Sequence, residues 1–173
     1  MGLNQFFITG LPRSRTAWMA AYLTGAWTHC YHDGLSVCKT KEEFDHLMSD
    51  QESLGFVDSI GNADSGLVLF DFQAFWPNVK TVIIHRSPVA VAQSLERVYG
   101  VKPLDEMVNE KAYQMESVAG YHVQFDRLDA ELESICDYLD INYDYYKHRL
   151  FKDMNIQTTR IFVDDFVPFW ETA

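Results

Sequence analysis

The hydrophobic residues of the chain fall into short runs separated by polar turns, and strand-like and helix-like patterns alternate along it. An aromatic and β-branched run, Phe6 to Thr9, ends at Gly10, and an apolar segment with helical spacing begins at Thr16 after a turn. Two near-continuous apolar runs, Gly66 to Phe72 and Val79 to His85, are typical of strands buried on both faces. The connection between them is too short for a helical crossover, so whether they are neighbours stays open. We predict an α/β fold of three layers with a mainly parallel central sheet.

Weaker patterns supply the remaining elements of the predicted domain. Ala26 to Asp33 is predicted as a second short strand, and Ser117 to Phe125 as a later one. Gly55 to Gly66 is rich in turn residues and predicts a loop around a brief strand at Phe56 to Val57. Helical periodicity predicts helices at Thr40 to Met48, Pro88 to Tyr99, Lys102 to Gln114, Asp126 to Tyr138 and Tyr143 to Met154. Because no linker, repeat or low-complexity tract interrupts the pattern, residues 1–173 are predicted to form one domain.

The sequence also predicts the start of one of these helices and the buried face of another. Thr40 and Glu43 form a capping-box pattern, which marks the start of a helix. The helix at Asp126 to Tyr138 is predicted to face inward with Leu128, Leu132, Ile135 and Cys136.

The composition narrows the classes of function. With 47% hydrophobic and 14% aromatic residues, a chain of 173 residues can bury a substantial core. The formal net charge of −11 argues against nucleic acid as a partner, but a local cluster of arginines can still bind a small anion. The three cysteines cannot all be paired, and neither a secretory leader nor a membrane-spanning run is apparent. We expect a soluble cytoplasmic protein, monomeric or homodimeric, that does not associate with membranes.

The turn between the first strand and the first helix carries a chemical signal. A loop that leads into a helix N-terminus presents unpaired backbone N–H groups and the positive end of the helix dipole, and so suits a phosphate or sulfate. Arg13 and Arg15 lie on this loop, and the hydroxyl groups of Ser14 and Thr16 lie beside them. The loop is not a Walker A sequence, which needs a second glycine and a lysine. The alternative is an ordinary strand-to-helix turn with two solvated arginines.

A second basic turn follows the strand predicted at Val79 to His85. Arg86 leaves this strand, Ser87 is a plausible N-cap, and Pro88 takes the favoured first position of the next helix. Ser94 lies on that helix, so Arg86 and Ser94 can flank one crevice and hold a second phosphate.

Three side chains are candidates for a general base. His32 and Asp33 end the second predicted strand, where ligands of open α/β sheets bind, and Asp71 lies near the end of a strongly apolar run. The alternatives are that His32 and Asp33 are ordinary polar residues and that Asp71 pairs with an arginine.

A zinc site is a weaker hypothesis. His29, Cys30, His32 and Cys38 are close in sequence, but neighbours along a strand point to opposite faces and no CxxC or HxxxH spacing is present. We predict no metal.

Both basic turns resemble motifs of the sulfotransferases, enzymes that move a sulfuryl group from 3′-phosphoadenylyl sulfate (PAPS) to a hydroxyl or amine. PRSRTAW at Pro12 to Trp18 is similar to the PKSGTTW-type loop that binds the 5′-phosphosulfate. RSPVAVAQS at Arg86 to Ser94 matches the RxPxxxxxS segment, whose arginine and serine hold the 3′-phosphate. His122 to Leu139 resembles the later strand and helix of the family. The three segments occur in the family's order.

The resemblance implies a P-loop NTPase-like nucleotide-binding fold, with PAPS or its product adenosine 3′,5′-bisphosphate as the cofactor. Arg13 would take the position of the family's lysine, with a catalytic and a cofactor-binding role. The 5′ loop would be completed by Ser14, Arg15, Thr16, Ala17 and Trp18, and the 3′-phosphate would be bound by Arg86 and Ser94. Asp33 or Asp71, or else His32, would be the catalytic base, and the acceptor would be a small molecule or a glycan.

The chain departs from the family pattern in three respects. Arg15 stands where the loop has glycine, the chain is short, and the late basic motif is missing, although Arg149 or Lys152 could replace it. Two alternatives therefore stay open. One is a small P-loop kinase that uses ATP, against which the absent Walker lysine counts. The other is a nucleotide-binding or assembly module without catalytic activity.

Overall fold

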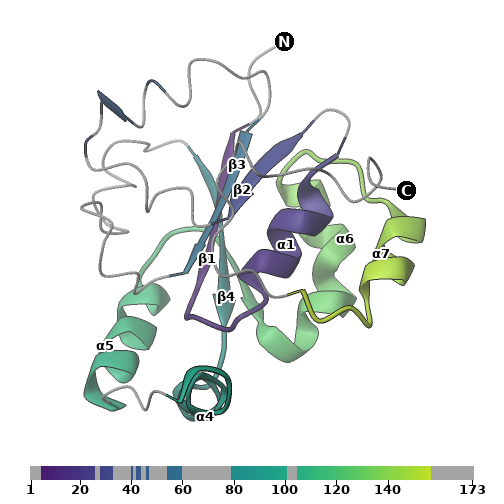
Figure 1. Cartoon of the computed structure of the whole chain (residues 1–173). Coiled ribbons are helices and arrows are strands. Elements are labelled where there is room, and N and C mark those ends of the chain that lie inside the picture. The colour runs from purple at the N-terminus through teal and green to yellow at the C-terminus, as the bar shows by residue number, and fades with distance from the viewer. Residues whose placement is uncertain are drawn as a thin grey trace.

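The fold is built on a parallel β-sheet. A computed structural model describes residues 5–25, 28–32, 40, 42–43, 46, 54–59, 79–100 and 105–156. Its sheet has the strand order β2-β3-β1-β4-β5, and every neighbouring pair is parallel (Figure 1). The strands are β1 (Phe6–Gly10), β2 (His29–His32), β3 (Leu54–Ser59), β4 (Lys80–His85) and β5 (Tyr121–Gln124). The predicted parallel sheet is confirmed.

Helices cover both faces of this sheet. One face carries α1 (Thr16–Leu23), α6 (Leu128–Tyr138) and α7 (Tyr145–Phe151), and a 3-10 turn at Phe125–Arg127 leads into α6. The helices α4 (Pro88–Tyr99) and α5 (Asp105–Glu116) pack on the other face (Figure 1). The domain is therefore an α/β fold of three layers, as the sequence predicts.

The central strands contribute to two cores because their successive side chains point to opposite faces. On β4, Ile84 packs in the larger cluster with α1 and α6, whereas Ile83 packs in a smaller cluster with α4 and α5. Both side chains are fully buried. Burial on both faces explains why the β4 sequence is apolar without alternation.

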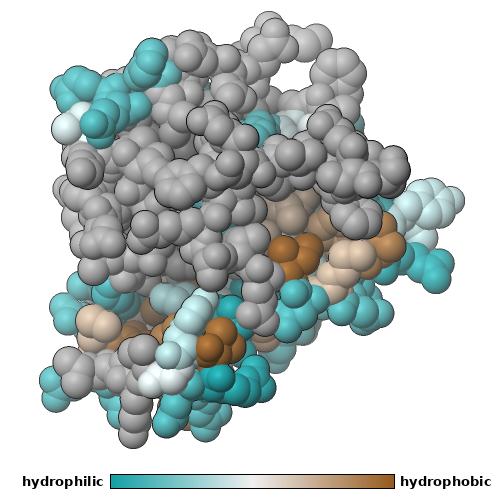
Figure 2. All heavy atoms as spheres, in the orientation of Figure 1, coloured by the Kyte–Doolittle hydropathy of each residue, from teal (hydrophilic) through white to brown (hydrophobic). Residues whose placement is uncertain are grey.

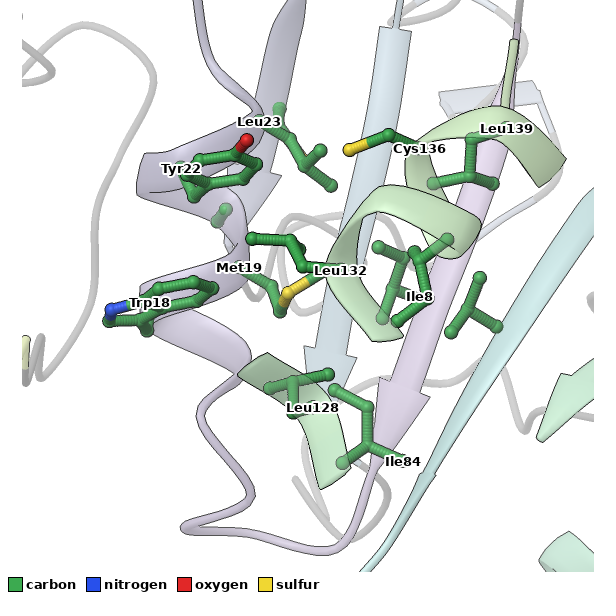
Figure 3. Packing of buried hydrophobic residues seen from close by; sticks show 14 of the residues in the cluster. Ile8, Trp18, Met19, Tyr22, Leu23, Ile84, Leu128, Leu132, Cys136 and Leu139 are labelled. Carbon is green, nitrogen blue, oxygen red and sulfur yellow. The ribbon is translucent and has the colours of Figure 1, made fainter. Parts of the chain in front are cut away.

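The larger core is formed where α1 and α6 pack on β1 and β4. Figure 3 shows Met19 and Leu23 of α1 pointing toward Leu132 of α6, with Ile8 of β1 beneath them. The inward face predicted for the Asp126 to Tyr138 helix is confirmed, since Leu128, Leu132, Ile135 and Cys136 are all buried.

One predicted element is longer and more central than expected. The sequence predicts a loop over Gly55 to Gly66 with a brief strand at Phe56 to Val57, but β3 runs from Leu54 to Ser59. It pairs with β1 on one side and with β2 on the other. The brief strand at Phe56 to Val57 is confirmed. The expected loop was wrong at 55 and 58–59, because local turn residues give no sign of the backbone pairing that two flanking strands provide.

The helix starts follow the capping patterns in the sequence. The Glu43 backbone N–H donates to Thr40 Oγ1 at 3.2 Å, and the Thr40 N–H donates to the Glu43 carboxylate at 3.2 Å, which is the predicted capping box. The other residues of the predicted helix, at 41, 44–45 and 47–48, lie outside the described residues. In α4, Ser87 is the N-cap and Pro88 the first residue, but the Ser87 side chain makes no capping hydrogen bond.

Several other predictions can be compared with the described parts of the chain. The run at Gly66 to Phe72 lies outside them, so its prediction as a strand is not tested. Cys30 and Cys136 are both buried. Within the ranges that the structure describes, no helix is long and apolar enough to span a bilayer.

Candidate anion-binding site

The loop between β1 and α1 is tightly folded beside β4. A Cβ atom on Gly10 would lie 3.0 Å from the Ile84 carbonyl oxygen and 3.1 Å from Ser14 Cβ, so glycine allows this close approach. Arg13 and Arg15 have φ angles of 69° and 62°, in the left-handed region that non-glycine residues rarely adopt. Contacts elsewhere must offset the conformational cost of this loop.

The position of the loop in the sheet favours ligand binding. In open α/β sheets, ligands bind beyond the carboxyl ends of the strands, where the strand order changes direction. In the order β2-β3-β1-β4-β5, β1 and β4 lie at that change of direction. Arg13 follows β1 and Arg86 follows β4, so the two arginines come from the two strands that border this point.

The structure brings Arg13, Arg86 and Ser94 together. Arg13 Nε donates to Ser94 Oγ at 3.2 Å, which joins the loop to α4. The Arg86 guanidinium donates to the Arg13 carbonyl oxygen, across 73 positions of sequence. The two basic turns that the sequence singles out are thus in direct contact.

No carboxylate of a described residue pairs with Arg13 or Arg86, although the chain has 25 acidic residues. Arg86 instead packs on the Phe125 ring, 4.2 Å from its centroid. Partial burial, followed by the positive charges of Arg13 and Arg97, lowers the pKa of Arg86. A bound anion would relieve this repulsion.

Ser14 provides independent support for a ligand. Its residue is fully buried, and its Oγ has no hydrogen-bond partner within the described part of the chain. A buried hydroxyl without a partner costs about 1–3 kcal/mol. Because Ser14 lies between the two arginines of the loop, an anion oxygen bound there could accept its hydrogen bond. The residues present therefore fit a phosphate or sulfate group.

Arg15 and Trp18, which the resemblance assigns to the same loop, direct their side chains to α6 and α7 instead. Arg15 Nη1 lies 2.9 Å from Asp129 Oδ2, and Nη2 donates to the Lys152 carbonyl oxygen at 3.2 Å. Trp18 is buried, and its Nε1 donates to the Phe151 carbonyl oxygen at 2.8 Å. Within the described residues, neither side chain forms a hydrogen bond or ion pair with Arg13, Arg86 or Ser94.

The remaining residues of the predicted 5′ loop have more limited roles. Ala17 is half-buried in the first turn of α1 and can offer a ligand only backbone groups. Of the two residues proposed to replace the late basic motif, Lys152 contacts Arg15 through its carbonyl oxygen, and Arg149 is exposed beside the Tyr145 ring.

Of the three candidate bases, His32 lies beside the loop. It is buried at the end of β2, and its Nε2 is 3.2 Å from Oγ1 of Thr16, the first residue of α1. Asp33 and Asp71 lie outside the described residues, so their predicted roles are not tested.

No metal centre is found in the part of the chain that the structure describes. No group there of three or more His, Cys, Asp and Glu side chains could hold a metal ion. His29 packs against Tyr31 with ring centroids 4.4 Å apart, and burial lowers its pKa. Cys38, the fourth residue of the zinc hypothesis, lies outside the described ranges.

Sequence reasoning missed several residues of this region. Phe125 supports Arg86, the Tyr99 ring lies 6.0 Å from Arg13 Cζ, and Asp129 holds Arg15. Asp129 is 114 positions from Arg15, so no local pattern links them. Tyr99 lies on α4 as Ser94 does, but the two are not at the i,i+3 or i,i+4 spacing of one helix face, so the sequence carried no signal for it.

Comparisons with known proteins agree with this fold. No protein-family model matches the chain, and no curated protein matches its sequence. Three solved structures are similar to it: mouse sulfotransferase SULT7A1 complexed with PAP, the sulfotransferase domain of the Synechococcus PCC 7002 olefin synthase, and a sulfotransferase from Alicyclobacillus acidocaldarius. Their sequence identities to the chain are 14%, 15% and 12%, and their TM-scores are 0.52, 0.61 and 0.53.

The three similar structures match most of this chain. The matches cover 85%, 84% and 84% of this chain, and 62%, 76% and 83% of the three solved chains in the same order. The chain thus spans less than two thirds of the mouse protein. These likenesses confirm the resemblance at the level of the fold: the chain has the P-loop-like α/β fold of sulfotransferases.

Proposed function

We propose that the protein is a sulfotransferase that uses PAPS and transfers its sulfuryl group to a hydroxyl or amine of a small molecule or glycan. The observation that carries the proposal is the contact of Arg13 with Ser94 and of Arg86 with Arg13, beside the partnerless Ser14 hydroxyl of the described loop. One protein of similar fold, mouse SULT7A1, was solved in complex with PAP. The shared fold supports the same ligand class here.

Each end of the nucleotide has a set of groups that could hold it. Arg86 and Ser94 would bind the 3′-phosphate. Arg13, the Ser14 hydroxyl and the backbone N–H groups at the start of α1 would bind the 5′-phosphosulfate. Arginine suits both places because its planar guanidinium group can donate two parallel hydrogen bonds to a phosphate.

The reaction needs charge stabilisation and a base from this chain. When bound, PAPS supplies the sulfuryl group on a phosphosulfate bridge. Arg13 would stabilise the negative charge that develops on the leaving phosphate, and such fixed donors commonly contribute the largest share of catalysis. His32, Asp33 or Asp71 would take the proton of the acceptor. The proximity of His32 Nε2 to Thr16 Oγ1, 3.2 Å, supports His32 for this role, whereas Asp33 and Asp71 lie outside the described residues.

The first test is ligand binding by the intact protein. We expect adenosine 3′,5′-bisphosphate to raise the melting temperature more than AMP or ATP with Mg²⁺, because a ligand that binds only the folded state stabilises it. Arg86→Ala should abolish this shift. Arg127→Ala is the matched control, since Arg127 is 64% exposed and pairs with Glu131 at 3.7 Å.

The other outcomes distinguish the alternatives. An unchanged shift in Arg86→Ala would remove the 3′-phosphate assignment. A shift chiefly with ATP and Mg²⁺ would favour a P-loop kinase. Binding of adenosine 3′,5′-bisphosphate without any sulfuryl transfer to a panel of hydroxyl and amine acceptors would favour a module that binds nucleotide but lacks turnover.

A further inference from the structure

Arg15 has a backbone conformation that its residue type does not favour. It is the N-cap of α1 with φ 62° and ψ 24°, in the left-handed region. Glycine adopts this conformation without penalty, whereas a residue with a Cβ atom does so at a conformational cost. The Arg15 carbonyl oxygen accepts from the Met19 N–H at 2.9 Å, but its side chain makes no capping bond to α1 and is available for contacts outside the helix.

The Arg15 side chain is held by three contacts, one each with α6, α7 and α1. It forms an ion pair with Asp129 of α6 and donates to the carbonyl oxygen of Lys152, the C-cap of α7. Its guanidinium also lies over the Trp18 ring, 4.4 Å from the centroid. The guanidinium is therefore committed to contacts within the protein itself.

Asp129 also faces His148 of α7 on its other side. Its Oδ1 is buried without a hydrogen bond to any described residue and faces His148 Nε2 at 3.6 Å. His148 Nδ1 lies 2.6 Å from the Tyr143 hydroxyl. If the hydroxyl donates to Nδ1, Nε2 carries the proton and points it at the carboxylate, which is the favourable tautomer. Asp129 thus connects the loop to α7.

We propose that Asp129 is a positioning residue for the loop at 11–15 between β1 and α1, the anion loop. Its ion pair with Arg15 holds Arg15 in the left-handed conformation and so keeps the loop in the shape that binds an anion. The identity of the anion as a PAPS-type nucleotide rests on the proposed function. The Arg15 side chain is then a tether between the loop and α6, rather than a ligand of the nucleotide. Arg13 is tethered on the opposite side of the sheet, to Ser94 of α4.

A pair of variants at position 15 separates a tether from a ligand contact. Arg15→Ala and Arg15→Gly both remove the guanidinium, but only alanine keeps the backbone penalty. We expect Arg15→Gly to bind adenosine 3′,5′-bisphosphate several-fold more tightly than Arg15→Ala in titration calorimetry. Equal affinities in the two variants would overturn the proposal, because they would mean that the loop conformation does not limit binding.

A double-mutant cycle tests Asp129 directly. When Arg15 is present, we expect Asp129→Asn to weaken the binding of adenosine 3′,5′-bisphosphate roughly tenfold. The loss equals the free-energy cost of the left-handed conformation, which the ion pair no longer offsets. In the Arg15→Gly background, the same change should have less than about a twofold effect. Asp137→Asn on the exposed face of α6 is the matched control, and it should leave the nucleotide affinity unchanged in both backgrounds. An equal loss in both backgrounds would contradict the proposal.

The same cycle in urea unfolding needs no ligand. Asp129→Asn should lower the unfolding midpoint in the wild-type background and leave it unchanged or raised with Arg15→Gly, at a constant m-value. If this coupling is present but the wild-type protein does not bind adenosine 3′,5′-bisphosphate, the tether stands and the proposed function fails. If the nucleotide binds but no coupling appears, the tether is wrong and the proposed function stands.

Discussion

In the anion loop, single residues lower the stability of the protein while they shape a binding site. Arg13 and Arg15 adopt glycine-like backbone angles, and the Ser14 hydroxyl is buried without a partner in the described residues. Each of these features destabilises the unliganded loop. Such features are typical of functional sites, where stability is given up for a preformed shape.

Ser14→Ala tests this interpretation at the residue scale. Removing a buried hydroxyl that lacks a partner should leave the free energy of unfolding unchanged or raise it by about 1 kcal/mol. The affinity for adenosine 3′,5′-bisphosphate should fall, because the proposed hydrogen bond to the anion is lost. Urea unfolding and calorimetric titration measure the two quantities. A loss of stability with unchanged affinity would show that the hydroxyl serves the fold alone.

At the scale of the element, α6 joins the core to the site. Its buried face packs in the larger cluster with α1 and β4, and its first turn carries Asp129, which reaches the loop. Amphipathic periodicity predicts the buried face of such a helix but does not distinguish the exposed positions. The role of Asp129 therefore became visible only when α6 was seen to pack beside the loop.

A matched pair of leucines tests the packing of these helices. Leu132 on α6 is fully buried, whereas Leu150 on α7 is 57% exposed. We expect Leu132→Ala to lower the free energy of unfolding by about 2–5 kcal/mol through lost burial and a cavity. Leu150→Ala should change it by no more than about 0.5 kcal/mol. Similar effects of the two changes in urea unfolding would contradict the core described here.

At the scale of the molecule, an acidic chain presents a local arginine site. The net charge is −11, yet Arg13 and Arg86 meet at the carboxyl ends of β1 and β4. Charges farther away than about 10 Å are largely screened at physiological salt, so the local cations can dominate at the loop. Among the residues coloured in Figure 2, small apolar areas lie over α4 and beside α7, between hydrophilic residues.

Two histidines predict how stability depends on pH. Burial lowers the pKa of His29 and of His85 from 6.5, and the neighbouring His122 lowers the pKa of His85 further. The unfolded chain then binds more protons below pH 6.5 than the folded protein does, so stability falls as the pH decreases through this range. The urea midpoint should be lower at about pH 5.5 than at about pH 7.5. The double variant His29→Asn/His85→Asn should show a smaller difference, and an equal difference would exclude these groups as its cause.

Local sequence was sufficient for most of the elements and for the two basic turns. Apolar periodicity, the turn at Gly10 and the pair Ser87 and Pro88 act within a few residues, so they predict β1, α1, β4 and α4 without knowledge of the fold. The spacing of Arg86 and Ser94 likewise depends only on a helix following a strand. These features can be predicted from the sequence because the interactions that create them join residues only a few positions apart.

The tertiary structure decided which of these pieces meet. It inserted β3 between β1 and β2, and it joined Arg15 to Asp129 over 114 positions. Both outcomes depend on backbone pairing and side-chain packing between distant segments, whose geometry exists only after the chain has condensed around a common core. The sequence alone determined where the charged residues stand, and packing determined which of them hold the loop and which can face an anion.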